Sequence, residues 1–445
     1  MVTLMKHEAA INPLALELNS ILDKSSAGPF LSALGRRLFF PRGIIAQAAE
    51  AKKTARVNAT LGMAFHDGQP LILSALAREL PGLKPEESVV YAPTAGVEVF
   101  RLAWKTGLLQ KNPSLKEADF SLPVVVPGIA SGISYIADLF LDHGETMLAG
   151  DPWWDNYSLI FTERRGALLK GIPLFAESAG TTGSGTDSGL HSGLDIGAFE
   201  KALKEEAASG TVRIILNFPQ NPSGYTPTAA EADTLVRLVK DTAISGVPVL
   251  VICDDAYFGL FYEEKTIKES LFSRFASLHE KVLAVKIDGP TKEDYVWGFR
   301  TAFVSFGSKG LDEASYAALE KKLIGAIRSS VSCANTPAQY LALKTMNDPT
   351  TQADKAAFFA MLRGRYLAVK RFIEENPLPR GLQVLPFNSG YFMSFRCKAV
   401  EQLRQTLLKK GIGTIALGDE YLRVTFAAIE ETDIPEVYRA IYSSV

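Results

Sequence analysis

Lys292 and Arg300 are spaced as a pair of residues that could bind a reactive phosphorylated ligand. Lys292 follows the alternating, strand-like segment 281–288 and a turn at Gly289 and Pro290, and Arg300 comes eight residues later. A lysine amine can form an imine with an aldehyde or another carbonyl compound. An arginine can hold a phosphate through two parallel N–H groups. The spacing therefore predicts a site for a ligand that carries both functional groups.

Polar residues also follow three other strand-like segments. Asn221 lies in NFPQNPSG after the run TVRIIL, Asp254 and Tyr257 lie in CDDAY after VPVLVI, and Gly128 opens the turn after LPVVVP. Each alone has an ordinary explanation, since NPSG is usually a turn, DDAY could cap a helix and a single lysine is usually solvated. Because open α/β sheets bind ligands at the carboxyl ends of their strands, the residues together predict one shared site.

The predicted site matches the functional groups of one cofactor. A helix that starts at Gly128 would offer free backbone N–H groups to a phosphate. An aspartate would hold a protonated ring nitrogen, and an asparagine and a tyrosine could hydrogen-bond to a ring hydroxyl. Aldehyde, phosphate, ring nitrogen and ring hydroxyl occur together in pyridoxal 5′-phosphate. We therefore expect Lys292 to carry this cofactor as a Schiff base and Arg300 to hold its phosphate.

The surrounding segments predict the elements that position these residues. Strand-like and helix-like segments alternate through the middle of the chain, and several strands are continuous Val/Ile/Leu runs, which is typical of a mostly parallel sheet covered on both faces. We expect a large cofactor-binding α/β domain at 61–330. After the predicted helix 311–330 the pattern changes to helices with antiparallel-looking strands. A smaller α+β domain is expected at 331–445, with the N-terminal segment 1–60 contributing to it.

Composition narrows the class of protein. The 445 residues are 47% apolar and 22% charged with a formal net charge of −2, which is ordinary for a globular protein and suggests neither nucleic acid nor membrane as a partner. Cys253, Cys333 and Cys397 lie far apart, which excludes a disulfide framework, and we expect no metal site. The chain has no HExxH, GxSxG or Walker-type motif and no long apolar span. The cytoplasm is the expected compartment.

The chain resembles the fold-type I pyridoxal-phosphate enzymes of the class I/II aminotransferase family, near the aspartate aminotransferase branch. The resemblance runs from about Asn58 to the C-terminus, and the motifs NPSG with DDAY, TK with an arginine eight residues on, and YLRVTFA carry it. It implies that Lys292 is the Schiff-base lysine and that Asp254 is the partner of the pyridine nitrogen. Asn221 and Tyr257 would contact the ring hydroxyl.

The resemblance also assigns residues around the cofactor ring and its phosphate. Trp154 in DPWWDNY stands where an aromatic residue of this family stacks on the ring, although it could simply belong to the core. Gly128, Ile129 and Ala130 stand at the helix start that cradles the phosphate. Tyr91 in VVYAPTAG resembles the tyrosine that reaches the phosphate from the other subunit, which implies a homodimer with shared active sites.

Three further residues are implied to bind the substrate. Gly62 in NATLGMAF resembles the glycine beside the substrate, and Arg423 in YLRVTFA falls where the family binds the substrate α-carboxylate. Arg328 resembles the arginine that, in aspartate aminotransferases, reaches across the dimer to a side-chain carboxylate. Alternatively, Arg328 is a plain basic residue that complements a helix C-terminus.

Several positions depart from the family pattern or have no assigned role. Gly289 stands where a phosphate-binding hydroxyl residue is usual, and Thr291 stands where serine is usual. Asp255 occupies a slot that is often small, and no role for its charge near the cofactor follows from the sequence. The Gly/Ser/Thr-rich segment 178–193 could be a phosphate loop, but its composition favours a surface insertion.

The predicted activity is transamination between an L-amino acid and a 2-oxo acid. Lys292, Asp254 and Tyr257 are the expected catalytic residues, and Lys292 would move the substrate α-proton as general base and acid. An acidic amino acid is the favoured donor, with 2-oxoglutarate as acceptor. The alternatives are a β-lyase or decarboxylase built on the same residues, and a non-catalytic ligand-sensing domain.

Overall fold

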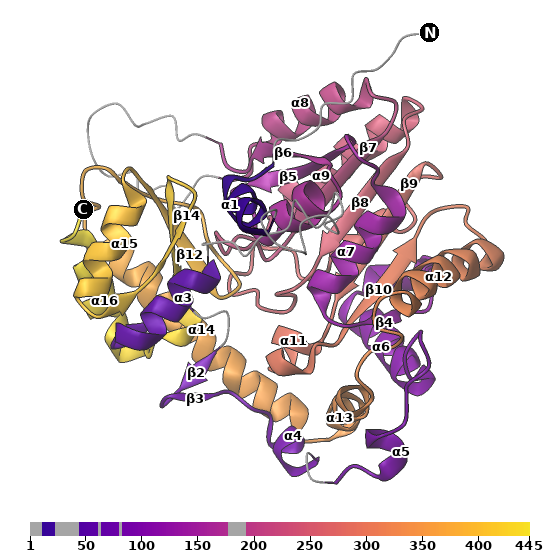
Figure 1. The fold of residues 1–445 in the computed structure, drawn as a ribbon, viewed down its shortest axis with the longest axis horizontal. Coiled ribbons are helices and arrows are strands. Elements are labelled where there is room, and N and C mark those ends of the chain that lie inside the picture. Colours follow the sequence, from indigo (N-terminus) through magenta and orange to yellow (C-terminus); the bar gives the residue numbers. More distant parts are fainter. Residues whose placement is uncertain (1–10, 23–43, 61–63, 80–81, 177–192) are drawn as a thin grey trace.

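Two β-sheets organise the protein (Figure 1). The computed structural model describes residues 11–22, 44–60, 64–79, 82–176 and 193–445. The larger sheet has seven strands in the order β4 (Val124–Val126), β10 (Ala302–Gly307), β9 (Val282–Asp288), β8 (Val249–Asp254), β7 (Val212–Asn217), β5 (Thr146–Asp151) and β6 (Leu168–Pro173). β10 pairs antiparallel with β4 and β9, and the other strand pairs of this sheet are parallel. The mostly parallel α/β sheet predicted from the Val/Ile/Leu runs is confirmed.

Successive residues of the central strands belong to two separate hydrophobic clusters. Ile215 and Ile252 pack into one cluster, whereas Ile214 and Val251 pack into the other. The first cluster lies under α7 (Ile129–Phe140) and α12 (Glu313–Arg328), and we call this side of the sheet the α7 face. The second lies under α6 (Glu98–Lys111), α8 (Ile196–Ala207) and α9 (Ala229–Ile244), and we call it the α6 face. Side chains along a strand point alternately to the two faces of the sheet, and helices cover both faces. Each of these strands is therefore apolar along its whole length.

A smaller antiparallel sheet lies towards the C-terminus. Its strands, in spatial order, are β11 (Leu382–Val384), β12 (Phe392–Cys397), β15 (Tyr421–Thr425) and β14 (Ile415–Leu417). We call this sheet, with η5 (Phe426–Ala428), α15 (Val400–Lys409) and α16 (Ile434–Tyr442), the C-terminal unit. The N-terminal strand β1 (Val57–Asn58) pairs in parallel with β13 (Ile412–Gly413), which attaches the N-terminal segment to this unit. The smaller α+β layer is confirmed, while the domain boundaries at 60 and 330 stay predictions.

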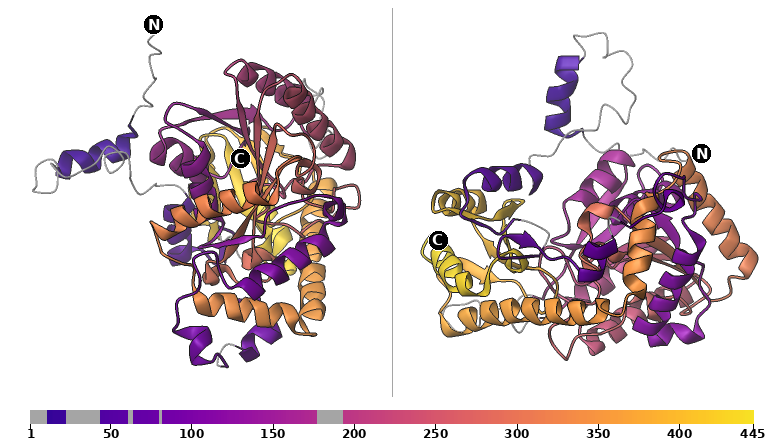
Figure 2. Two further views of the ribbon diagram at one scale, coloured as in Figure 1. Left: turned by 90° about the vertical axis from the view of Figure 1, so that its right-hand side faces the viewer. Right: turned by 90° about the horizontal axis from the view of Figure 1, so that it is seen from below.

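The long helix α14 (Thr351–Glu375) runs from the region of α4 (Ser74–Glu79) and α13 (Thr336–Asn347) to the C-terminal unit (Figures 1 and 2). Its Arg365 is buried and donates to the Ala427 carbonyl at 2.6 Å and to Glu430 at 2.7 Å. The remaining elements are α1 (Pro13–Leu22), α3 (Ile44–Thr54), β2 (Phe65–His66), β3 (Gln69–Pro70), α5 (Pro85–Ser88), η2 (Pro113–Glu117), η3 (Ser158–Arg164), α10 (Phe272–Phe275), α11 (Pro290–Glu293), η4 (Trp297–Phe299) and η6 (Glu431–Asp433).

The NPSG turn lies directly against the C-terminal unit. A Cβ atom on Gly224 would lie 1.9 Å from the Phe392 carbonyl oxygen, and its φ of +80° also favours glycine. The Gly224 carbonyl accepts hydrogen bonds from the Asn388 and Ser389 amides at 2.8 and 2.9 Å. The Ser394 hydroxyl donates to the Pro222 carbonyl at 2.8 Å. The two sheets are therefore joined backbone to backbone at this turn.

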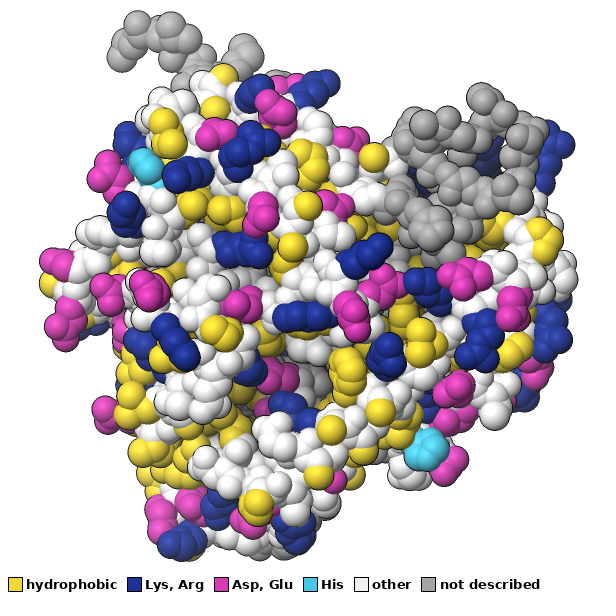
Figure 3. Space-filling view, turned by 180° about the vertical axis from the view of Figure 1, so that it is seen from behind, with side chains coloured by type: hydrophobic (Ala, Val, Ile, Leu, Met, Phe, Trp, Pro, Cys, Tyr) yellow, Lys and Arg dark blue, Asp and Glu magenta, His cyan; other side chains and the backbone are white. Residues whose placement is uncertain are grey.

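The surface carries charges of both signs. On the face drawn in Figure 3, Lys and Arg side chains alternate with Asp and Glu side chains over most of the area. Among the helices that the structure describes, none is both long enough and apolar enough to cross a membrane. Most of the predicted insertion at 178–193 lies outside the described residues, as does Gly62.

Candidate active site

A cavity of about 320 Å³ lies on the α7 face, at the carboxyl ends of β7 and β8. Its lining includes the predicted residues Ile129, Ala130, Trp154, Asn221, Asp254, Tyr257, Lys292, Arg300 and Arg423. It also includes Thr60, Asn217, Ala256, Thr291, Trp297 and Phe392. The structure thus brings together nine residues that are distributed over almost 300 positions of the sequence.

Lys292 projects into this cavity from the short helix α11, which follows β9 directly. Its Nζ lies 4.8 Å from the centre of the Tyr257 ring. The pKa of Lys292 is lowered to about 8, mainly because the amine is buried; the charge of Asp254 opposes the shift and that of Arg300 adds to it. A lysine with this pKa has a substantial neutral fraction near physiological pH, and the neutral amine is the nucleophilic form.

This lowered pKa predicts how fast the cofactor-free protein captures pyridoxal 5′-phosphate at different pH values. Below the pKa of about 8 the amine is mostly protonated, so the capture rate should rise about tenfold per pH unit and level off above it. Stopped-flow absorbance of the bound cofactor measures this rate. A midpoint at the ordinary lysine value of 10.5 would contradict the assigned environment.

Asp254 ends β8 on the same side of the sheet as Lys292. Its Oδ2 accepts a hydrogen bond from the Tyr157 hydroxyl at 2.5 Å, and its Oδ1 accepts one from the Ala256 amide at 3.2 Å. Burial raises the pKa of Asp254 to about 6, while the Tyr157 hydrogen bond and the charge of Lys292 oppose the shift. The carboxylate is therefore ionised at neutral pH and can pair with a protonated ring nitrogen.

Tyr157 and Asn217 hold the predicted residues in place and were not predicted. Asn217 donates to the Asp254 carbonyl at 2.8 Å and accepts from the Asn221 amide at 2.8 Å. The signal for Asn217 is its place at the end of the run TVRIILN, and the signal for Tyr157 is its place three residues after Trp154. Both side chains orient groups that would contact a cofactor.

Arg300 lies against the start of α7. A Cβ atom on Gly128 would lie 2.5 Å from the Arg300 Nη2 atom, and Gly128 has a φ of +92°. A side chain at this position would fill the space beside the guanidinium group. A helix N-terminus with an arginine beside it suits a phosphate, because backbone N–H groups and the guanidinium group can both donate to it.

The missing hydroxyl at Gly289 has a steric explanation. A Cβ atom on Gly289 would lie 2.7 Å from the Ala302 Cα atom and 2.9 Å from the Thr301 carbonyl oxygen of the adjacent chain segment. No side chain fits between the two backbones. Thr291 lines the cavity instead, and its hydroxyl lies 3.4 Å from the Thr301 carbonyl.

Arg423 reaches the cavity from the middle of β15. It donates to the Asn221 Oδ1 atom at 3.1 Å and to the Thr60 carbonyl at 3.3 Å, and it lies 4.5 Å from the centre of the Phe392 ring. Its buried Nε atom has no hydrogen-bond partner among the residues that the structure describes. A buried donor left without a partner is costly, so this guanidinium group is suited to receive a carboxylate.

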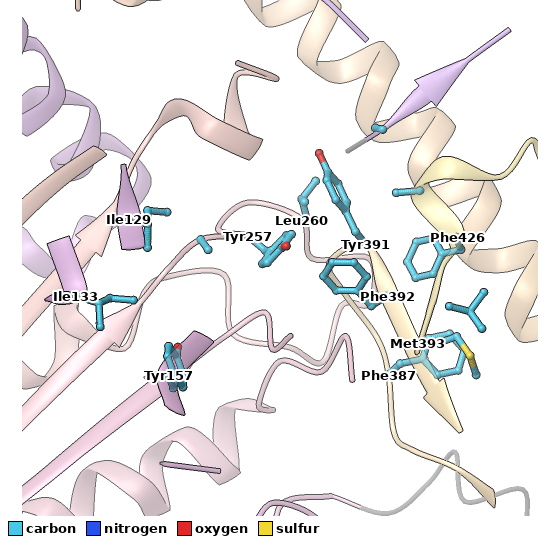
Figure 4. Packing of buried hydrophobic residues seen from close by; sticks show 14 of the residues in the cluster. Ile129, Ile133, Tyr157, Tyr257, Leu260, Phe387, Tyr391, Phe392, Met393 and Phe426 are labelled. Carbon is cyan, nitrogen blue, oxygen red and sulfur yellow. The ribbon is translucent and has the colours of Figure 1, made fainter. Parts of the chain in front are cut away.

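Aromatic side chains form the remaining walls of the cavity. Tyr257 lies between Ile129 and the rings of Tyr391 and Phe392, at 5.4 and 5.3 Å from their centres (Figure 4). Trp154 lines the cavity, whereas the neighbouring Trp153 donates to the Ser158 hydroxyl and does not line it. This placement favours the stacking role of Trp154 over a purely structural one.

Asp255 and Lys286 pair with each other on the α6 face. Lys286 donates to Asp255 and lies 3.4 Å from Asp288, and the Ser270 hydroxyl donates to Asp255 at 2.6 Å. Trp104 of α6 donates to the other oxygen of Asp288 at 3.1 Å. The charge of Asp255 therefore neutralises a buried lysine, and neither residue lines the cavity.

Three predicted residues that the structure describes, Gly128, Tyr91 and Arg328, do not line the cavity. Gly128 lies beside Arg300 at the start of α7. Tyr91 is 89% exposed in the segment after α5, and Arg328 is exposed at the C-terminal end of α12. Gly62 lies outside the described residues. The structure of one chain leaves the roles of Tyr91 and Arg328 as predictions.

Comparisons with known proteins identify the family. A curated aspartate aminotransferase from Sulfurisphaera tokodaii is 21% identical over 391 residues, which are 84% of this chain and 87% of that protein. An aminotransferase structure from Anaerococcus prevotii has a TM-score of 0.78 at 20% identity, over 91% of this chain and 97% of that one. A kynurenine aminotransferase structure from Pyrococcus horikoshii, in complex with PMP, has a TM-score of 0.75 at 16% identity, over 95% and 98% of the chains.

The family model "Aminotransferase class I and II" matches residues 66–441, which include every cavity-lining residue except Thr60. Lys292, Asp254 and Arg423, which lie around one cavity, are within the matched residues. The chain therefore belongs to the class I and II aminotransferase family and is a pyridoxal-phosphate-dependent transaminase.

Proposed function

We propose that Lys292, Asp254 and Tyr257 are the catalytic residues of this transaminase and that its amino donor is an acidic L-amino acid. The observation that carries the catalytic part is the convergence of Lys292 and Asp254 on one cavity that also contains Arg300 and Arg423. The family membership favours transamination over a β-lyase, a decarboxylase or a ligand-sensing domain.

The donor set fits pyridoxal 5′-phosphate. Arg300 and the start of α7 at Ile129 and Ala130 would hold the phosphate, Asp254 the ring nitrogen, and Asn221 the ring hydroxyl together with Tyr257. Lys292 would bind the aldehyde, and Trp154 would stack on the face of the ring. When bound, the cofactor supplies an electron sink for the bond that breaks at the substrate α-carbon.

The protein residues supply binding, orientation and proton transfer. Arg423 would bind the substrate α-carboxylate and so orient the α-proton towards Lys292. The Lys292 amine, with its lowered pKa, would remove that proton and return it as general base and acid. Asp254 would keep a proton on the ring nitrogen, since Tyr157 and the Ala256 amide fix its two oxygens. Trp154 and Phe392 would limit the access of water.

We further propose a homodimer with shared active sites. Tyr91 is almost fully exposed, and the neighbouring Val89 and Val90, together with Val99 and Leu102 of α6, are exposed apolar residues. Apolar residues that are exposed close together commonly mark an interface. A second copy of the chain that covered them would also bring Tyr91 towards the phosphate of the partner subunit.

The three cysteines are unpaired in the structure. They support the cytoplasmic location proposed from the sequence, because persistent disulfides belong to oxidising compartments.

The proposed preference for an acidic donor allows the role of Arg328 in substrate binding to be tested. If Arg328 reaches the partner's site, Arg328→Ala should lower kcat/KM for aspartate and glutamate by about tenfold to hundredfold, because a charge-assisted contact is lost. The values for alanine and phenylalanine should change little. Steady-state kinetics on these four amino acids, with 2-oxoglutarate as acceptor, measures the effect.

Mixed dimers separate a shared site from a site within one chain. In a dimer of one Arg328→Ala subunit and one Lys292→Ala subunit, one site would contain both intact side chains only if Arg328 acts across the interface. Such dimers should have a higher kcat/KM for aspartate per intact Lys292 than the Arg328→Ala parent. No such gain would reject action of Arg328 across the interface, and an unchanged aspartate value in Arg328→Ala would remove Arg328 from the site. A preference for phenylalanine in the wild type would reject the acidic donor.

A further inference from the structure

Two lysines, from helices that are far apart in the sequence, form ion pairs with the two residues that follow Lys292. Lys111, the last residue of α6, donates to both carboxylate oxygens of Glu293 at 2.7 and 2.9 Å. Lys355 of α14 donates to Glu293 at 3.3 Å and to Asp294 at 2.7 Å. We call Lys111, Glu293, Asp294 and Lys355 the lysine-turn cluster, since they surround the turn that carries Lys292.

The cluster is largely shielded from water. The side chains of Asp294 and Glu293 are 9% and 11% exposed, and those of Lys355 and Lys111 are 24% and 29% exposed. Burial alone would raise the pKa of Glu293, but the two lysines outweigh it and hold the pKa well below its usual value. Shielded ion pairs of this kind are screened less by salt than exposed ones. The cluster is therefore a stable set of contacts near neutral pH.

The turn depends on such contacts because it is short. Helix α11 has four residues, and an isolated helix of that length does not hold its shape in water. On its N-terminal side the turn is fixed by the close approach of Gly289 to Ala302. On its C-terminal side, Glu293 and Asp294 form ion pairs with Lys111 and Lys355, and the Tyr295 ring packs against Phe358 of α14 at 5.0 Å between centres.

Helix α14 gives Lys355 a rigid base. Leu362, Tyr366 and Val369 of this helix are buried, and Arg365 is anchored to the Ala427 carbonyl of the C-terminal unit. Lys355 and Arg365 lie about 15 Å apart along the helix axis. The same helix therefore contacts the Lys292 turn at one end and the unit that carries Arg423 further along (Figure 1).

We propose that Lys355 is a positioning residue for Lys292, acting through Glu293 and Asp294. The inference rests on the proposed role of Lys292 as the residue that binds the cofactor. Lys355 does not line the cavity, so it would act by fixing the direction in which the Lys292 amine approaches the cofactor aldehyde. Loss of its contacts should slow covalent capture of the cofactor without removing any group that touches it.

The test compares Lys355→Met with Lys370→Met in the full-length protein stripped of cofactor. Lys370 lies on the same helix, is 29% exposed and pairs with Glu263, which is remote in sequence from the Lys292 turn. Each variant therefore removes one half-buried lysine charge of α14, which pairs with Glu293 and Asp294 in the case of Lys355 and with Glu263 in the case of Lys370. Lys355→Met should capture pyridoxal 5′-phosphate about tenfold more slowly than the wild type at pH 8, because a small misplacement of a reacting group has a large kinetic cost.

Lys370→Met should capture the cofactor at the wild-type rate, and Lys355→Arg, which keeps the charge, should restore most of the lost rate. If Lys355→Met does not fold, Glu293→Gln is the second variant: it weakens the contacts of the turn with both Lys111 and Lys355 and should also slow capture. Equal slowing in Lys370→Met, an unchanged rate in Lys355→Met, or no recovery in Lys355→Arg would overturn the positioning role. Absence of covalent capture in the wild type would instead overturn the proposed role of Lys292 itself.

Discussion

Lys292→Ala is expected to lower turnover by at least about 10⁴-fold, because it removes the proposed general base and the amine that binds the cofactor. Protein stability should not fall, because a buried amine whose pKa is lowered to about 8 is itself unfavourable when charged. Steady-state kinetics and a thermal unfolding curve measure the two effects.

Chemical trapping identifies the lysine independently of the variant. Borohydride reduction of the loaded enzyme followed by peptide mapping should label Lys292. Lys286 is the nearest alternative in sequence, but it is fully buried against Asp255 and Asp288 on the α6 face. A label on Lys286 would show that the assignment is wrong.

Asp254→Ala is expected to lower kcat by about 10³-fold to 10⁴-fold, which corresponds to about 4 to 5.5 kcal/mol of transition-state stabilisation. The reason is that an unprotonated ring nitrogen withdraws electrons poorly, and Asp254 is the carboxylate that lines the cavity. Steady-state kinetics with the cofactor in excess separates this effect from weaker cofactor binding.

Asp255→Asn is the matched control for this substitution. Asp255 is the next residue and is equally buried, but its partners are Lys286 and Ser270 rather than cavity-lining residues. The control should lower the unfolding temperature while kcat stays close to the wild-type value. Near-normal kcat in Asp254→Ala, or an equal loss in Asp255→Asn, would contradict the assigned role.

The role of Asp254 could be predicted from the sequence, whereas that of Asp255 could not. The apolar runs ending at Asn217 and Asp254 predicted the strands and the edge of the sheet at which the site lies. The role of Asp255 did not follow from its own neighbourhood, because its partner Lys286 lies on another strand. Alternation of side chains in β9 places Lys286 on the α6 face, but the pairing required the order of strands β8 and β9.

The supporting residues of the site were harder to predict for the same reason. Tyr157 contacts Asp254 from a segment almost 100 residues earlier in the chain, and an aromatic residue within DPWWDNY is equally typical of a core. The absence of a hydroxyl at Gly289 was visible in the sequence. Its cause, the approach of the backbone to Ala302, depends on β9 and β10 being adjacent.

The contact between the NPSG turn and β12 restricts how the two sheets can move relative to each other. The carbonyl oxygens of Pro222 and Gly224 accept four hydrogen bonds from Asn388, Ser389 and Ser394, and these three residues are buried. A rigid rotation of the C-terminal unit that separated these segments would leave those groups unpaired. The axis of any such rotation therefore has to pass close to Gly224. Residues near the axis move least, so Asn221 and Arg423 would keep their mutual geometry while more distant parts of the C-terminal unit travel further.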